Sequence, residues 1–183
     1  MSLEETAARG LSGIAYRALL HQVLSCLDWQ QTNAPAAIKQ QLRDMCAQEI
    51  ILSAELEQID TGIIYGLACS ELGKRIRAAR RLYREAPFTL RMTAEELGLK
   101  ADLLPREEIL LQGIIDLYFY EDDGSLVLVD YKTDHIVPEA EEEMKRRYGR
   151  QIKLYRLALE RITQRQVKTA GIYLLPQQRW VEM

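Results

Sequence analysis

Two carboxylates and a lysine follow apolar, strand-like runs in the second half of the chain. One apolar run ends on Asp116, and the next ends on Asp130, Tyr131 and Lys132. Because residues two apart in a strand share a face, Asp130 and Lys132 are expected to project together, with Tyr131 pointing away. If the two runs pair as a hairpin, Asp116 lies beside Asp130.

These residue types suit the hydrolysis of a phosphodiester bond. Two carboxylates at one place repel each other, and a hard divalent cation such as Mg²⁺ or Mn²⁺, which takes oxygen ligands, balances their charge. Such a metal activates water and clamps the phosphate oxygens, while the Lys132 ammonium suits the charge that develops on the phosphate. Asp-x-Lys alone is also a common surface pair, but two successive strand ends carrying Asp116 and Asp130 favour the catalytic interpretation.

Gln151 and Tyr155 form a second candidate pair. They are four residues apart in a segment with a helical pattern, so they share a helix face. One interpretation places both near the metal site or a nucleic-acid backbone. The other has Tyr155 packing in the core and Gln151 facing solvent.

The elements that must position these residues follow from periodicity and turn residues. In the first 80 residues, apolar positions recur near every 3.6 residues, which predicts helices. We expect helices over about 14–27, 35–57 and 61–69, and a further helix from Ser70. Asp60 is a candidate N-cap for the third of these helices.

From residue 81 the pattern becomes strand-like. Residues 81–92 alternate and contain Pro87, which predicts an edge or bulged strand. The sequence predicts further strands and one long helix, namely strands 109–120 and 126–131 joined by a hairpin link, a helix over 139–163, and strands 170–175 and 180–182. This order predicts an α/β fold with a mixed central sheet flanked by helices and a helical N-terminal part.

Composition indicates one globular domain. The chain has 183 residues, of which 48% are hydrophobic and 28% charged. No apolar run approaches the roughly 18 residues of a spanning helix, and the acidic start is unlike a secretory signal. Cys26, Cys46 and Cys69 form no C-x-x-C pair, so neither a zinc nor an iron–sulfur site is predicted. Reduced thiols in a cytoplasmic protein are expected.

Charge is unevenly distributed although the net charge is only −3. Residues 74–84 contain six cations, and residues 145–168 contain nine cations and one acid, Glu160. Such segregation can create a basic face that attracts phosphates on an acidic protein. A solvated helix surface is the alternative interpretation.

Four segments together resemble a known family. Gly113-Ile-Ile-Asp116, Asp130-Tyr-Lys-Thr-Asp134 and Gln151-x-x-x-Tyr155 resemble the motifs of the RecB family of nucleases, within the PD-(D/E)xK superfamily. Residues 84–90 resemble the R-E-x-P-F strand of the same family. The likeness is greatest to the C-terminal nuclease domains of AddA-type helicase–nucleases. It implies a restriction-endonuclease-like fold over residues 12–183, with a helical part 12–80, a catalytic α/β core 81–183, and residues 1–11 as a tag or disordered lead.

The resemblance also assigns roles in a metal centre. It implies that Asp116 and Asp130 are metal ligands, that Lys132 is the catalytic lysine, and that the main-chain carbonyl of Tyr131 completes the metal shell. Thr133 and Asp134 match the same motif as support for the loop.

Further roles rest on the remaining motifs. In the family, a G-T-x-x-H helix supplies a metal-binding histidine; His21 matches it, although Arg17 and Ala18 replace the glycine and threonine. Gln151 and Tyr155 are implied to position substrate or the attacking water. Glu85 matches a family acidic position, and an ion pair with a nearby arginine explains it equally well.

The function implied by the resemblance is Mg²⁺-dependent hydrolysis of DNA, with Mn²⁺ or Ca²⁺ as other possible occupants of the site. The partners would be single-stranded DNA, the helicase motor of the same full-length chain, and a second protein that is AddB-like, acting in double-strand break repair without a membrane. The chain has no G-x-x-x-x-G-K-[ST] loop, so it resembles an excised nuclease domain. The alternatives are a catalytically silent docking module for DNA or a partner, and a metal-dependent phosphatase or other small-molecule hydrolase.

Overall fold

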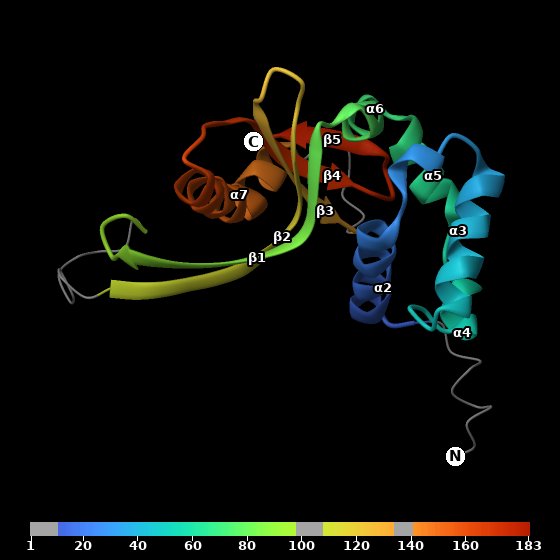
Figure 1. Ribbon diagram of the computed structural model, residues 1–183. Helices are drawn as coiled ribbons and strands as arrows, with labels where there is room; N and C mark the ends of the chain where they lie inside the picture. Colours follow the sequence, from blue (N-terminus) through green and yellow to red (C-terminus); the bar gives the residue numbers. More distant parts are fainter. Residues whose placement is uncertain (1–10, 98–107, 134–140) are drawn as a thin grey trace, which may run out of the picture. The chain divides into compact units, whose positions relative to one another are not determined.

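The computed structural model describes residues 11–97, 108–133 and 141–183. Within them the chain forms helices and strands in the following order: α2 (Gly13–Cys26), η1 (Trp29–Gln31), α3 (Pro35–Ala47), α4 (Ser53–Leu56), α5 (Thr61–Cys69), α6 (Glu71–Ala78), β1 (Arg81–Thr93), β2 (Glu108–Tyr120), β3 (Leu126–Lys132), α7 (Glu141–Thr163), β4 (Val167–Leu174) and β5 (Arg179–Glu182) (Figure 1). The structure divides into two compact units. The first comprises the described parts of 1–79, 131–135 and 173–180, and the second comprises the described remainder. No helix in the described ranges has the length and apolar character needed to cross a bilayer.

Helices α2 and α3 bury the apolar positions that the 3.6-residue period predicted. Ser12 caps α2 by accepting a hydrogen bond from the backbone N–H of Ala15. The buried side chains of the two helices are Leu19, Leu20, Val23, Leu24, Ile38, Leu42 and Met45. The helical character predicted for the N-terminal part is therefore confirmed.

The prediction of one continuous helix over 35–57 is wrong, because α3 ends at Ala47 and α4 is a separate short helix. Glu49 adopts a left-handed conformation with φ 57°. The N–H of Glu49 donates to the carbonyl of Cys46, and the N–H of Ile50 donates to that of Met45. These two bonds form a Schellman motif, which ends a helix and is usually built on glycine.

Helix α5 begins at the N-cap Asp60 that the sequence predicted, and α6 begins after Ser70, where a further helix was expected. Asp60 accepts a hydrogen bond from the N–H of Gly62, and Ser70 accepts one from the N–H of Gly73. A Cβ on Gly73 would lie 2.2 Å from the carbonyl oxygen of Leu67, so only glycine allows α6 to start this close to the end of α5.

The second half builds a five-stranded sheet in the order β1-β2-β3-β4-β5. Strands β1, β2 and β3 pair antiparallel, with the predicted hairpin link between β2 and β3 turning at Gly124, whose φ is 79°. β3 and β4 are joined through α7, and the N–H of Leu175 bonds the carbonyl of Lys132, so their C-terminal ends lie together and the pair is parallel. The predicted mixed α/β sheet is therefore confirmed.

Strand β1 lies at the edge of the sheet, as its proline predicted. Pro87 lacks an N–H, and an edge strand has one side that needs no ladder bond. β3 pairs with β2 only from Leu117 to Tyr120, so the remainder of β1 and β2 continues beyond β3 as a bent two-stranded ribbon (Figure 1).

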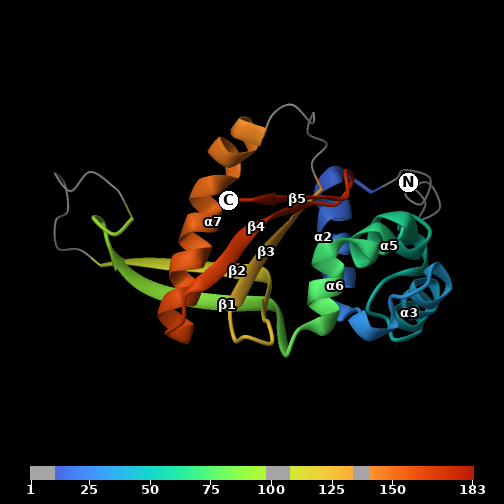
Figure 2. The ribbon, with the colours of Figure 1, turned by 90° about the horizontal axis from the view of Figure 1, so that it is seen from above.

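Helix α7 packs against the strands of the second unit through one face (Figure 2). Its buried side chains are Met144, Tyr148, Ile152, Ala158 and Leu159. Near its end, Arg161 pairs with Glu96 and donates to the carbonyl of Arg91, which ties α7 to the end of β1. The predicted helix over 139–163 is confirmed for its described residues, and residues 139 and 140 lie outside the described ranges.

Candidate active site

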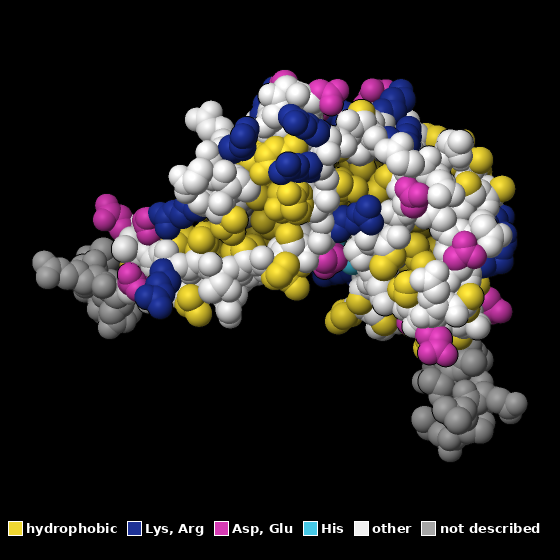
Figure 3. Space-filling model, in the orientation of Figure 1, with side chains coloured by type: hydrophobic (Ala, Val, Ile, Leu, Met, Phe, Trp, Pro, Cys, Tyr) yellow, Lys and Arg dark blue, Asp and Glu magenta, His cyan; other side chains and the backbone are white. Residues whose placement is uncertain are grey.

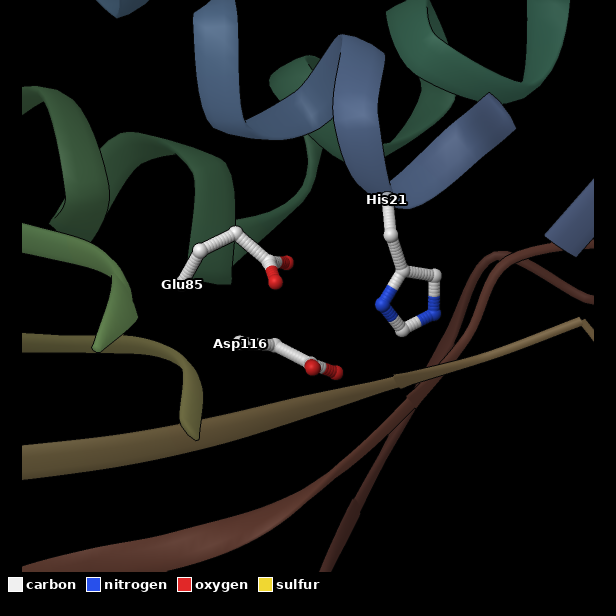
Figure 4. Close-up of side chains that lie close together, drawn as sticks. All are labelled: His21, Glu85 and Asp116. Atoms are coloured by element: carbon white, nitrogen blue, oxygen red, sulfur yellow. The ribbon is translucent and has the colours of Figure 1, made fainter. Parts of the chain in front are cut away.

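Two carboxylates face each other across strands β1 and β2. The pairs Arg84 with Leu117 and Ala86 with Ile115 place Glu85 opposite Asp116. Figure 4 shows these side chains from the two neighbouring strands, and carboxylate oxygens of the two lie within 4.8 Å of one another. Like charges directly opposite on a sheet destabilise it. A cation bound between them would remove that repulsion.

The backbone at Glu85 is unusual. Its φ is 43°, in the left-handed region that non-glycine residues occupy only when the surrounding structure holds them there. Regular ladder pairs continue on both sides of it. The strain is therefore confined to the residue that carries the carboxylate.

The third carboxylate comes from β3. The last pair between β2 and β3 joins Leu117 to Val129, and Asp116 and Asp130 are the next residues of the two strands. Asp130 is only 2% exposed. Asp116 thus has Glu85 opposite it on β1, while Asp130 follows the β3 residue that pairs with Leu117. The sequence prediction had placed Asp116 beside Asp130 but had not included Glu85.

Helix α7 brings Tyr155 to the same carboxylates. Burial raises the pKa of Tyr155, and the negative charges of Asp130, Asp116 and Glu85 raise it further, while a hydrogen bond from Gln151 acts in the opposite direction. The amide of Gln151 donates to the Tyr155 hydroxyl oxygen over 3.1 Å. With its pKa raised, Tyr155 keeps its proton at neutral pH and remains a hydrogen-bond donor next to three acids.

Gly113 makes room for the Tyr155 ring. The rings of Tyr155 and Phe88 meet edge to face at 5.6 Å, and Phe88 lies opposite Gly113 across β1 and β2. A Cβ on Gly113 would lie 2.7 and 2.8 Å from two ring carbons of Phe88 and 3.4 Å from a ring carbon of Tyr155. The glycine of the Gly113-x-x-Asp116 motif thus serves the packing that holds Tyr155.

We expect Gly113→Ala to destabilise the fold by about 1–3 kcal/mol, because the added methyl overpacks the buried ring of Phe88 against the half-buried ring of Tyr155. Gly149→Ala is the matched control: Gly149 lies inside α7, its Cβ would meet nothing within 4 Å, and alanine should stabilise the helix by up to ~1 kcal/mol. Urea unfolding of both variants measures the difference. Equal effects of the two substitutions would contradict the packing role of Gly113.

Lys132 and Tyr131 end β3, and Thr133 follows them. Lys132 is two residues after Asp130 and therefore shares its face, and its carbonyl accepts a hydrogen bond of 2.9 Å from the N–H of Leu175. That bond fixes the end of the strand. Asp134, the last residue of the motif, lies outside the described residues.

In the first unit, His21 of α2 packs against Tyr131. Their ring centroids are 6.1 Å apart and the planes are perpendicular. Tyr131 is 3% exposed and directly follows Asp130 in the chain.

Residues 14–180 match the family model described as the PD-(D/E)XK nuclease superfamily. The chain belongs to this superfamily. The family resemblance inferred from the motifs is therefore confirmed, and the mixed sheet with its helices is consistent with the restriction-endonuclease-like fold expected of a PD-(D/E)XK nuclease.

Its relatives are much longer proteins. The chain is 36% identical over 183 residues to the A subunit of the ATP-dependent helicase/nuclease of Syntrophomonas wolfei, covering 100% of this chain and 15% of that protein. Proteins of the same name from Alkaliphilus oremlandii (40% over 158 residues) and Thermoanaerobacter sp. (37% over 167 residues) align with 85% and 91% of this chain and with 13% and 14% of their own length. The chain thus spans only a small part of each relative.

The donor set of this PD-(D/E)XK site suits a divalent metal. Glu85, Asp116 and Asp130 offer hard oxygen ligands from adjacent positions on three neighbouring strands. Hard cations such as Mg²⁺, Mn²⁺ and Ca²⁺ take such ligands, and their charge would offset the mutual repulsion of the acids. The sequence signalled Glu85 only through its match to a family acidic position, and the register of β1 against β2 is what places it opposite Asp116.

Proposed function

We propose that this domain is a Mg²⁺-dependent deoxyribonuclease that hydrolyses phosphodiester bonds of single strands. The observation that carries the proposal is the row of Glu85, Asp116 and Asp130 across three neighbouring strands, with Lys132 on the same face of β3 as Asp130. Acids that gather a divalent cation next to an ammonium group match the charge requirements of phosphodiester hydrolysis.

The proposed metal ligands are the carboxylates of Asp116, Asp130 and Glu85, with the imidazole of His21 and the main-chain carbonyl of Tyr131. His21 is supported by its position in the family motif and by its packing against the residue that follows Asp130. A bound Mg²⁺ would supply activation of a water molecule and a clamp for the phosphate oxygens. Mn²⁺ and Ca²⁺ can occupy the same kind of oxygen site.

The other side chains act on substrate and water. The Lys132 ammonium stabilises the negative charge that develops on the phosphate. Tyr155, which stays protonated, donates a hydrogen bond toward a phosphate oxygen or the attacking water. Gln151 holds the Tyr155 hydroxyl in place through its 3.1 Å hydrogen bond. Since Gln151 acts through Tyr155 here, it is a positioning residue.

The relatives suggest the setting. Each is named as the A subunit of an ATP-dependent helicase/nuclease, and this chain aligns with 13–15% of the three compared above. We therefore propose that the domain works in the cytoplasm as part of a longer chain, whose motor delivers single-stranded DNA to it. The second subunit would be AddB-like, and the complex would process double-strand breaks for repair.

Cleavage of end-labelled single-stranded DNA tests the proposal. Cutting is expected with Mg²⁺, none is expected in EDTA, and a duplex of the same sequence should be cut more slowly. The products separated on a denaturing gel report all three conditions. Absence of cutting at any Mg²⁺ concentration would favour the alternative of a silent docking module.

A further inference from the structure

Three tyrosines form an aromatic cluster on the face of β1 and β2 that carries the carboxylates. Tyr83 and Tyr118 are paired across the two strands and stack with ring centroids 4.6 Å apart and planes within 7°. Tyr120 meets both rings edge-on, at 6.1 and 6.4 Å. Tyr83, on the edge strand, is 38% exposed. Tyrosine rings stacked at an open sheet edge leave an aromatic surface available to a further planar ring.

Three arginines surround a small cavity at one end of this cluster. The cavity measures about 220 Å³ and is lined by Arg80, Arg81, Tyr120, Gly124 and Arg165. None of these lining residues is acidic. Asp123 in the neighbouring hairpin is paired with Lys168, 3.0 Å away. In Figure 3, hydrophobic side chains gather over β1 and β2 with dark blue side chains beside them.

The cluster and the arginines extend from the candidate active site in regular steps. Asp116, Tyr118 and Tyr120 are alternate residues of β2 and share one face, and Glu85, Tyr83 and Arg81 lie opposite them on β1. Two residues of an antiparallel strand span about 6.8 Å, so the stacked tyrosines lie one step from the carboxylates and the arginine cavity two steps. Acids, aromatic rings and cations thus follow one another along a single strip.

We propose that this strip, made of Tyr83, Tyr118, Tyr120, Arg80, Arg81 and Arg165, binds single-stranded nucleic acid next to the site of cleavage. A base stacks on Tyr83 and a backbone phosphate lies among the arginines. Surfaces that bind single strands without sequence preference combine these two features. The inference rests on the proposed nuclease function, because the strip would bind the part of the DNA that leads to the cleavage site.

Charge and ring geometry favour this occupant over a protein. The cavity offers guanidinium groups, which match phosphate oxygens. Bases inside a duplex are already stacked on each other, so the aromatic part of the strip selects single strands.

Fluorescence anisotropy with labelled oligothymidylate in EDTA tests the aromatic part, since no cleavage is expected there. Tyr83→Leu removes the ring but keeps an apolar side chain, and should weaken binding roughly tenfold. Tyr83→Phe keeps the ring and should bind as the wild type does. Ile162→Ala is the control for the loss of an exposed apolar side chain, because Ile162 lies on α7 and is 53% exposed. It should leave the affinity for oligothymidylate unchanged.

Salt dependence tests the arginines. Removing one phosphate interaction should lower the slope of log affinity against log salt by about 0.7 for a single strand. Arg81→Ala should show this change on single strands, whereas Arg43→Ala on the exposed face of α3 should not. A duplex of the same sequence should respond to Arg81→Ala but not to Tyr83→Leu.

The outcomes separate this inference from the proposed function. Wild-type affinity in Tyr83→Leu and an unchanged salt slope in Arg81→Ala would overturn the binding strip, even if the protein cuts DNA with Mg²⁺. Weaker binding in Tyr83→Leu, restored in Tyr83→Phe, would support the strip even if cutting were absent. Equal loss in Tyr83→Leu and Ile162→Ala would also overturn it, because the effect would not depend on the ring.

Discussion

Replacing Lys132 by methionine is expected to reduce the rate of DNA cleavage by at least roughly 10²–10³-fold, the typical cost of losing one group that stabilises transition-state charge. Methionine matches the unbranched apolar stem of lysine and removes its charge. Metal affinity should stay close to the wild-type value, because the proposed ligands at Asp116 and Asp130 remain. Loss of cleavage with retained metal binding would separate the catalytic lysine from the metal ligands.

Single-turnover cleavage at saturating DNA measures the rate, and calorimetric titration with Mn²⁺ measures metal binding. Lys39→Met, on the exposed face of α3, is a control for the loss of one positive charge and should cut normally. Cleavage at the wild-type rate in Lys132→Met would remove this residue from the chemistry. A variant that lost both cleavage and metal binding would instead assign Lys132 a role in holding the metal site together.

The sequence predicted the pairing of Asp116 with Asp130 because their register is determined locally. Five residues link β2 to β3, and Gly124 supplies the left-handed turn that such a short link needs. Once the hairpin is recognised, apolar alternation leaves one register in which both strands bury their apolar face. The two acids then come together without information from the rest of the chain.

Glu85 could not be placed in the same way. Its position depends on how β1 pairs with β2, and the 14 residues that connect those strands, 94–107, do not fix a register. Its neighbours also offered a plausible ion pair with an arginine. Only the observed pairing of Arg84 with Leu117 puts Glu85 opposite Asp116. A tertiary pairing, rather than any local propensity, therefore completes the acidic site.

Two other features of the sequence were ambiguous for physical reasons. The end of α3 depends on Glu49 in a left-handed conformation, where glycine or asparagine would have signalled a stop. Arg77, one of the six cations in 74–84, donates to the carbonyl of Ala68 over 2.6 Å and lies partly buried. A charge count alone treats it as part of a basic surface, whereas its contacts give it a structural role.

Asp116→Asn is expected to abolish cleavage without destabilising the metal-free protein. Asp116 has the Glu85 carboxylate opposite it on β1, and like charges across a sheet cost roughly 0.2–1 kcal/mol per pair. Asparagine has nearly the same shape and removes this repulsion. In EDTA the variant should therefore unfold at the same temperature as the wild type or higher.

With Mg²⁺ present, the wild type should unfold at a higher temperature than Asp116→Asn. Mg²⁺ stabilises the wild type by an amount that grows with metal concentration above its dissociation constant, and the variant, which lacks the central ligand, should gain little. Thermal unfolding across a Mg²⁺ titration should thus give curves for the two proteins that meet or cross.

Glu108→Gln is the matched control, because Glu108 lies on the same strand β2, is exposed and pairs with Arg91. Glu108→Gln should change the unfolding temperature only slightly, and by the same amount with and without Mg²⁺. If Asp116→Asn lowered the unfolding temperature in EDTA by more than Glu108→Gln does, the Asp116 carboxylate would stabilise the fold without a metal. Its role would then be structural.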